Sequence, residues 1–201
     1  MPKYFQNFPV VKHTNQNLVD ITKRAKFKST IAENPNVYMP YTIKNDETVE
    51  ELSYYYYGTV DYVWMIWLAN DSLDPYKDWP MTDANLNAYI ADKYKEEYVA
   101  STGDTNPTPQ QVIEWTMNAT IDDNILYYEA QDEDGETIQV SLETWQLASI
   151  FDQEYAGKYE WTAVRIYDAE LEANENKRVI QVVNKDYAEQ IAREFKRLMN
   201  G

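Results

Sequence analysis

The chain has 201 residues and no cysteine, and its formal net charge is −16 at pH 7. The lack of thiols excludes disulfides and thiolate metal sites, and the acidic balance argues against nucleic acid as the main partner, because phosphate neutralisation needs a basic face. No stretch approaches the ~18 consecutive apolar residues of a membrane span or the basic-then-apolar order of a signal peptide. We therefore expect no membrane partner and maturation in the cytosol.

Charge and aromatic content favour a protein that makes interfaces. Tyrosine and tryptophan, 18 and 6 in number, exceed what a small core requires, and tyrosine is favoured where protein surfaces meet. The net charge is +4 over residues 1–36, −23 over 37–176 and +3 over 177–201. The basic ends can fold back on the acidic body, seat on acidic patches of neighbouring subunits, or simply be solvated.

The first segment, residues 1–36, is an expected N-terminal leader. Tyr4, Phe5 and Phe8 lack helical spacing, so they predict an extended arm with aromatic anchors, and a short helix is expected over 18–27. A leader of this kind has little core of its own, so we expect it to pack on something else.

The most patterned stretch is 41–80. A short strand is expected from Tyr41, and Thr48 followed by Glu51 forms a capping box for a helix that ends at Gly58. A second helix follows, for which Asp61 is the expected cap. Of the four consecutive tyrosines at 54–57, we expect Tyr56 to be buried, because four successive residues cover all sides of a helix.

The next segment predicts a helix from Thr82 to Val99 that is ended by Gly103. Asn-Pro-Thr-Pro at 106–109 is the clearest linker, and Thr108 with Gln111 forms a second capping box. All eight prolines lie at or before residue 109, so a domain boundary is expected at 104–108. The expected domains are 1–36, 37–103 and 108–201.

The last third predicts a mixture of strands and helices. Asp-Gly at 134–135 indicates a hairpin between strands. The expected elements are strands at 124–130 and 137–142, a helix at 143–155, a long strand at 159–173, a turn at 174–177, a strand at 178–183 and a helix capped by Asp186 with Glu189. The predicted class is α+β: a strand-helix-helix unit with an extended leader, followed by a mixed helix and antiparallel-hairpin region.

No catalytic, cofactor or metal site is predicted. His13 is the only histidine, so Ser-His or Cys-His catalysis has at most one base, in the leader. The acidic run at 132–135 is not a calcium loop, because with Gly135 at the sixth position Ala130 and Ser141 stand where acidic ligands are required. We interpret it as a turn.

The stretch YTIKNDETVEELS, the later Tyr-Tyr-Gly and the Leu-x-Asn that ends at Asn70 resemble a LysM module. The resemblance implies a groove between the loops that follow its first strand and second helix, here Asn45, Asp46 and Glu47, with Asn70, Ser72 and Leu73. It implies either glycan binding, the usual LysM activity, or a protein contact. After Leu73 the chain reads DPYKDWPM, where the family has a Gly-containing turn and a closing strand.

A second resemblance spans nearly the whole chain. Tyr4-Phe5-x-x-Phe8-Pro9, Leu18-Val19-Asp20-Ile21-Thr22, Asp78-Trp79-Pro80 and Asn174-Glu175-Asn176-Lys177-Arg178 together resemble the baseplate wedge protein family of T4-like contractile-tailed phages, which carries one LysM-like domain.

This second resemblance implies a non-enzymatic virion subunit that assembles in the host cytoplasm. Its expected partners are other wedge and tail subunits, and its expected role includes joining adjacent wedges. Tyr4, Phe5, Phe8, Lys177 and Arg178 are the expected assembly contacts. Two alternatives stay open: a LysM-type module binding peptidoglycan or chitin-like glycans, and a tail-associated cell-wall hydrolase, for which no catalytic constellation speaks.

Overall fold

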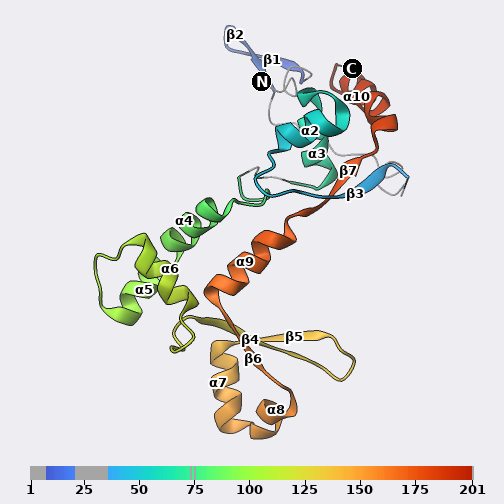
Figure 1. Ribbon diagram of the computed structural model, residues 1–201. Helices are drawn as coiled ribbons and strands as arrows, with labels where there is room; N and C mark the ends of the chain where they lie inside the picture. The colour runs from blue at the N-terminus through green and yellow to red at the C-terminus, as the bar shows by residue number, and fades with distance from the viewer. Residues whose placement is uncertain (1–7, 21–35, 73, 75, 201) are drawn as a thin grey trace. The chain divides into compact units, whose positions relative to one another are not determined.

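The computed structural model describes residues 8–20, 36–72, 74 and 76–200 (Figure 1). Its strands are β1 (Val10–His13), β2 (Gln16–Val19), β3 (Tyr38–Thr42), β4 (Ile125–Gln131), β5 (Thr137–Ser141), β6 (Thr162–Arg165) and β7 (Val179–Val183). Its helices are α2 (Val49–Tyr57), η2 (Val60–Tyr62), α3 (Val63–Ala69), α4 (Asp83–Lys93), α5 (Lys95–Thr102), α6 (Pro109–Met117), α7 (Leu142–Phe151), α8 (Gln153–Lys158), α9 (Ile166–Asn176) and α10 (Lys185–Asn200). The predicted α+β class is confirmed.

The chain divides into two compact units, and the second is inserted in the sequence of the first. Unit 1 is Met1–Pro80 together with Lys177–Gly201, and unit 2 is Met81–Asn176. The boundary that the linker predicted at 104–108 instead lies inside unit 2. The helices before and after it share one core, in which Tyr98 and Trp115 meet edge to face at 6.0 Å.

Unit 1 is built on a two-stranded antiparallel ribbon. β3 pairs with β7 from Tyr38 opposite Val183 to Thr42 opposite Val179. α2 and α3 pack on this ribbon through Leu52, Ile66 and other buried apolar side chains (Figure 1). The strand that pairs with the first predicted strand therefore does not follow α3 directly, because all of unit 2 lies between them in the sequence.

The local signals around α2 behave as the sequence predicts. Thr48 and Glu51 form a capping box, and Gly58 ends the helix in the left-handed region at φ 74°. The next cap differs from the prediction: Thr59, not Asp61, starts η2, because its side-chain hydroxyl accepts the backbone N–H of Asp61 at 3.1 Å. Threonine caps helices as aspartate does.

α10 closes the core of unit 1. Phe195 stacks on Trp64 of α3 with centroids 4.4 Å apart, and Ala188 and Ile191 join the same cluster. The side chain of Asn184 accepts the backbone N–H of Asp186 at 3.1 Å, so Asn184 takes the capping role that was expected of Asp186.

Near the N-terminus, the described residues form a hairpin, in which β1 and β2 pair from Val10 opposite Val19 to His13 opposite Gln16. All eight strand residues are exposed. The helix predicted from residue 18 is wrong at its start, because residues 18 and 19 belong to β2; residues 21–27 lie outside the described part. A short helical stripe is a weak signal, and here the pairing of β2 with β1 overrides it.

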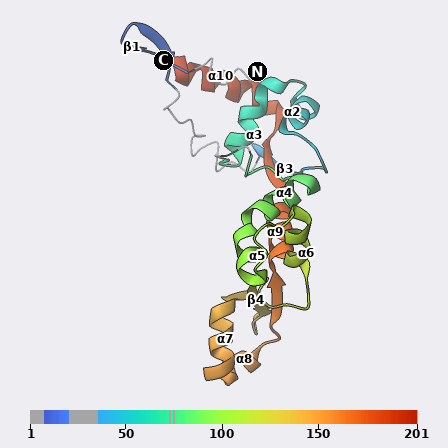
Figure 2. The same ribbon diagram turned by 90° about the vertical axis from the view of Figure 1, so that its left-hand side faces the viewer.

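Unit 2 contains a group of four helices, α4, α5, α6 and α9 (Figure 2). The predicted helix from Thr82 to Val99 is broken at Tyr94, which has non-helical angles of φ −106° and ψ 16°. There the Tyr94 hydroxyl donates to Glu170 of α9 at 2.6 Å, and Lys93 bonds the same carboxylate oxygen at 2.6 Å. Burial and this carboxylate raise the pKa of Tyr94 to about 12.

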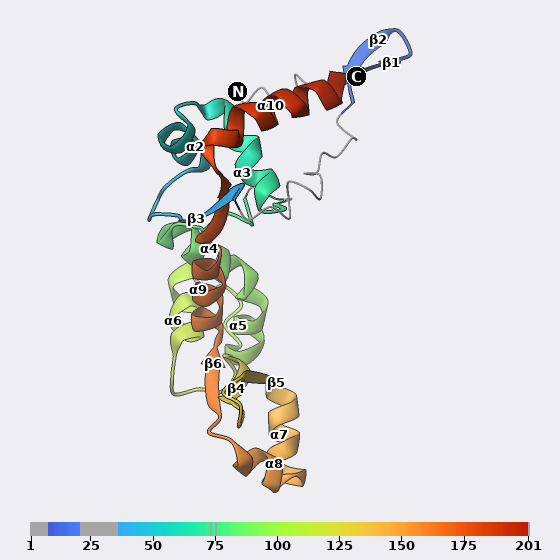
Figure 3. The same ribbon diagram turned by 90° about the vertical axis from the view of Figure 1, so that its right-hand side faces the viewer.

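The rest of unit 2 is a three-stranded antiparallel sheet in the order β5-β4-β6, with α7 beside it and α8 packed against α7 (Figure 3). The predicted 134–135 hairpin is confirmed by the pairing of β4 with β5, but the long strand predicted over 159–173 is wrong. Only Thr162–Arg165 is strand, and α9 begins at Ile166 and continues through the expected turn. Ala and Glu in this segment favour helix, and Ile166, Glu170 and Asn174 recur at helical spacing.

Candidate functional site

The first predicted groove loop follows β3 and is held from inside by Glu47. The carboxylate of Glu47 accepts the Tyr41 hydroxyl at 2.9 and 3.0 Å and the backbone N–H of Lys44 at 3.0 Å. Burial, and then the bond to Glu47, raise the pKa of Tyr41 to about 12. Asn45 and Asp46 are exposed at the tip of the turn, where Asp46 has φ 59°. The neighbouring side chain of Lys44 is exposed as well.

The second predicted loop is centred on Asn70, whose side chain is fully used within the protein. Its Nδ2 donates to the carbonyls of Ile66 and Gln181, both at 2.8 Å, and its Oδ1 accepts the backbone N–H of Gln181 at 2.8 Å. The amide thus pairs with the free edge of β7 as another strand would. Ser72 is half-buried, with its backbone N–H bonded to the Trp67 carbonyl at 3.0 Å, and Leu73 lies outside the described residues.

Trp79 connects the first loop to α3. Its indole N–H donates to the Glu47 carbonyl at 2.8 Å, and its ring meets that of Trp67 edge to face at 5.2 Å. Trp79 therefore links the first predicted loop to α3, the helix that leads into the second predicted loop. The side chains of Glu47 and Asn70 form bonds within the protein, and Asn45 and Asp46 are exposed groove residues that can meet a ligand.

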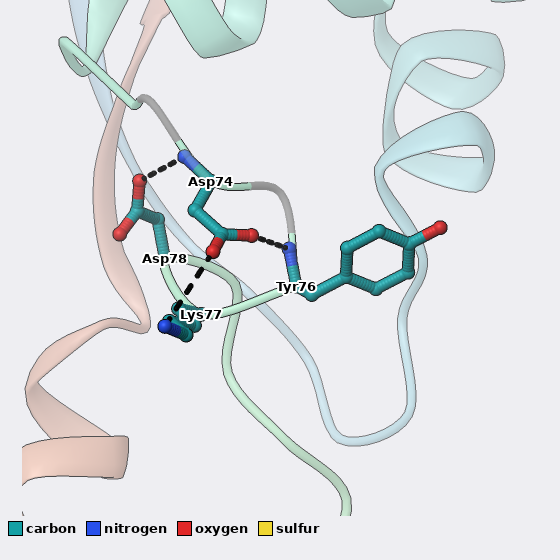
Figure 4. A network of polar contacts seen from close by, with 4 residues as sticks. All are labelled: Asp74, Tyr76, Lys77 and Asp78. Carbon is teal, nitrogen blue, oxygen red and sulfur yellow. Dashed lines mark hydrogen bonds and ion pairs between the residues drawn. The ribbon is translucent and has the colours of Figure 1, made fainter.

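Between α3 and α4 an acidic turn presents one aromatic side chain to solvent (Figure 4). The carboxylate of Asp74 accepts the backbone N–H of Tyr76 at 3.0 Å and lies 3.9 Å from the Lys77 ammonium, and Asp78 accepts the backbone N–H of Asp74 at 2.9 Å. Tyr76 is 89% exposed. The sequence analysis did not predict Tyr76 as a surface contact. The available signal was a single tyrosine in a segment rich in aspartate and proline, a composition that is typical of exposed turns.

The tyrosine run at 54–57 is split between surface and core. Tyr54 and Tyr55 are exposed, and the hydroxyl of the half-buried Tyr57 donates to the Val183 carbonyl at 2.9 Å. The predicted burial of Tyr56 is only partly met, since Tyr56 is half-buried as well. Ser53 fills the fully buried position on this side of α2, with its hydroxyl bonded to the Thr59 carbonyl at 2.8 Å.

Three of the five predicted assembly contacts fall within the described residues. Phe8 is 3% exposed and packs against Phe195, so it anchors the chain to its own core rather than presenting a surface. Lys177 and Arg178 are half-buried where the chain passes from unit 2 to unit 1, and the Arg178 carbonyl accepts the backbone N–H of Ile43 at 2.9 Å. Tyr4 and Phe5 lie outside the described part.

The two units differ sharply in charge. Unit 1 carries 14 basic and 13 acidic side chains, whereas unit 2 carries four basic and 21 acidic ones. The charge segregation seen along the chain is therefore a difference between two folded bodies. An acidic body of this kind attracts cationic surfaces and repels other copies of itself.

Among the residues that the structure describes, no three histidine or acidic side chains are arranged to hold a metal ion. Nor does any helix in this part of the chain have the length and apolar character needed to cross a bilayer. What these residues do offer is exposed apolar and aromatic surface on both units, chiefly on β1 and β2, α2, the turn at Tyr76, and α7.

Comparison with protein families finds a match over most of the chain. The profile of a phage family described as base plate wedge protein 53 matches residues 4–198, which includes nearly all of both units. A search of curated protein sequences finds no match.

Proposed function

Because this chain belongs to the base plate wedge protein 53 family of phages, a family of structural components of the virion tail, we propose that it joins neighbouring wedges. In this role one unit contacts subunits of its own wedge and the other contacts the adjacent wedge. The match across residues 4–198 carries the proposal, since it makes both units, rather than one module, the family's characteristic feature.

The surfaces of the two units support this division of roles. Unit 1 has nearly balanced charge and presents exposed aromatic side chains at Tyr54, Tyr55 and Tyr76. Unit 2 is strongly acidic and presents an apolar helix, α7. Tyrosines are favoured anchors in protein interfaces, and complementary charge sets register and the rate of association. Lys177 and Arg178, at the junction in the sequence, stay predicted contacts.

Reconstitution of the baseplate from purified wedge subunits tests the proposal. Wedges assembled with this protein are expected to close into rings that are visible by negative-stain electron microscopy, whereas wedges assembled without it stay separate. Closed rings of equal yield without the protein would contradict the joining role, and failure of the protein to co-sediment with wedges would contradict any wedge contact.

A second function, glycan binding by unit 1, has two observations in its favour. The order β3, α2, α3 and then the partner strand β7 is compatible with the LysM resemblance, and Asn45 and Asp46 are exposed at the expected loop. The internal bonds of Glu47 and Asn70 speak against a ligand role for those two side chains.

Calorimetric titration with chitin and peptidoglycan oligomers separates the two functions. Saturable binding that Asn45→Ala and Asp46→Ala abolish would establish the glycan module. We expect no heat of binding. We also propose that the protein has no hydrolase activity, and zymography on peptidoglycan, with lysozyme as the positive control, tests that expectation.

A further inference from the structure

Helix α7 has the composition of a buried helix but lies on the surface of unit 2. Its sequence, LETWQLASIF, contains six apolar residues and a single charged one, Glu143. None of its residues is buried. Soluble helices normally place charged and polar residues on the face that meets water, so an outward face of this kind calls for a partner.

The helix is nevertheless firmly placed. Trp145 stacks on Tyr128 of β4 with centroids 4.3 Å apart and planes at 13°. The Ser141 hydroxyl caps the first turn by accepting the backbone N–H of Thr144 at 3.2 Å, and Asp152 accepts the backbone N–H of Tyr155 at 3.1 Å to start α8. Figure 3 shows α7 lying beside the sheet strands. The orientation of its outward face is therefore set by unit 2 itself.

That outward face carries three large apolar side chains at helical neighbour spacing. Leu147, Ile150 and Phe151 are 57%, 65% and 82% exposed. Residues three and four apart lie side by side on a helix, so the three form one continuous patch, the α7 patch. Single exposed apolar residues are ordinary, but a contiguous set on a fixed helix is typical of an interaction site.

The surroundings of the α7 patch are acidic. Residues 122–160 hold 11 acidic side chains and one basic one, Lys158, whose ammonium is already 3.2 Å from Glu133. Glu143 lies one turn before Leu147, and Asp152 and Glu154 follow directly after Phe151. A second copy of the patch would meet this rim with like charges, which disfavours a symmetric contact of α7 with itself.

We propose that the α7 patch docks a segment of another baseplate wedge subunit that presents apolar side chains within a rim of lysine and arginine. The inference rests on the proposed function, since it names a surface of unit 2 and the chemistry of what binds there. Burial of the patch supplies affinity, and the acidic rim speeds association and rejects acidic competitors.

The first experiment is photo-crosslinking in the reconstituted wedge. The amino acid p-benzoylphenylalanine is placed at position 151, and at the exposed position 110 of α6 as a control. After irradiation with the other purified wedge subunits, position 151 is expected to crosslink to a peptide that contains apolar residues flanked by Lys or Arg. Crosslinks to a second copy of this chain, to an acidic peptide, or to nothing would overturn the proposal.

The second experiment measures binding of the full chain to each immobilised wedge subunit. Phe151→Gln and Leu147→Gln are each expected to weaken binding to one subunit by at least tenfold. Met117→Gln, a similar change at a 45% exposed residue of α6, is expected to change the affinity for that subunit by less than twofold. Since the substituted side chains are exposed, all three variants keep the fold, which circular dichroism verifies. Raising NaCl from 0.1 to 0.5 M is expected to slow association about tenfold or more.

The outcomes separate this inference from the proposed function. If the unmodified protein binds wedge subunits but Phe151→Gln and Leu147→Gln bind equally well, the α7 docking site is wrong and the wedge role stands. If the unmodified protein binds no wedge subunit, both are wrong.

Discussion

At the scale of single residues, two asparagines hold together parts of the chain that are far apart in sequence. Asn70 pairs through its amide with both backbone groups of Gln181, and the buried Asn174 pairs in the same way with Met81, at 2.8 and 3.0 Å. A side-chain amide has the same donor and acceptor as a peptide group, so each can substitute for a neighbouring strand. Asn70 closes an edge in unit 1, and Asn174 joins the two ends of unit 2.

Replacing Asn70 by alanine is expected to destabilise unit 1 by about 1 kcal/mol, because it removes the hydrogen bonds to Gln181, whose exposed backbone groups can then bond to water instead. Asn45→Ala, at an exposed turn, is expected to stay within about 0.5 kcal/mol. Urea unfolding monitored by tryptophan fluorescence measures both. Equal midpoints for the two variants would show that the Asn70 bonds contribute little.

The bond between Tyr41 and Glu47 predicts a pH dependence. The pKa of Tyr41 in the folded protein, about 12, lies above its ordinary value of 10.0, so folding favours the neutral phenol. This contribution is fully present below about pH 10 and is lost as the pH rises from about 10 to 12. Tyr41→Phe is therefore expected to cost about 1 kcal/mol at pH 8, and the difference from wild type should shrink by pH 11.

Thermal unfolding at pH 8, 10 and 11 tests this expectation. Tyr55→Phe, at a 79% exposed side chain, is the matched control and should show no difference at any of the three values. A gap between wild type and Tyr41→Phe that stays constant up to pH 11 would contradict the assignment.

The sequence located some of these residues but not their roles. The LysM resemblance predicted Asn70 and Glu47 as groove residues. In the structure the side chains of both form hydrogen bonds within the protein. The reason is distance along the chain: Gln181, the partner of Asn70, is 111 positions away. Short-range patterns contain no information on such a pairing.

At the scale of helices and strands, local signals predicted several helix ends correctly but did not always distinguish a strand from a helix. The capping boxes at Thr48 and Thr108 and the left-handed Gly58 were correct, because each depends on residues within one turn. The segment 159–173 was wrong, because a period of two and a helical period both fit it. Its strand portion is fixed by pairing with β4 and its helical portion by the core with α4 and α6.

Two glycines give a matched test of this local control. Gly58 has φ 74° with open space around its Cβ position, so Gly58→Ala is expected to cost about 1 kcal/mol through backbone strain alone. Gly157 lies within α8 without a positive φ and also with open space, so Gly157→Ala is expected to stabilise unit 2 by about 0.5–1 kcal/mol. Denaturant midpoints that move in the same direction would contradict the assignment.

At the scale of the whole chain, the main surprise is the insertion. The proline-containing linker at 106–109 looked like a domain boundary, yet it is a loop inside unit 2 that leads into the capping box of α6. The real division after Asn176 coincides with the change from acidic to basic net charge, whereas no such change marks the division after Pro80. Both divisions follow from the pairing of β3 with β7, which no local pattern specifies.

The insertion predicts which fragments fold. Residues 81–176 contain their whole helical core and sheet, so they are expected to fold alone and give a dispersed amide NMR spectrum. Residues 1–80 lack β7 and α10 and are expected to remain unfolded. Joining 1–80 to 177–201 through a short Gly-Ser linker should restore folding. A folded 1–80 fragment would contradict the division.

The insertion also sets an order of events on the ribosome. β3 emerges early, but its partner β7 is synthesised about 140 residues later, an interval of roughly 7–28 s at elongation rates of about 5–20 residues per second. The whole of unit 2 is synthesised before β7, so it can fold first. The nascent first unit must wait with its apolar strand uncovered, so its exposure to chaperones and aggregation is fixed by the speed of translation rather than by its own folding rate.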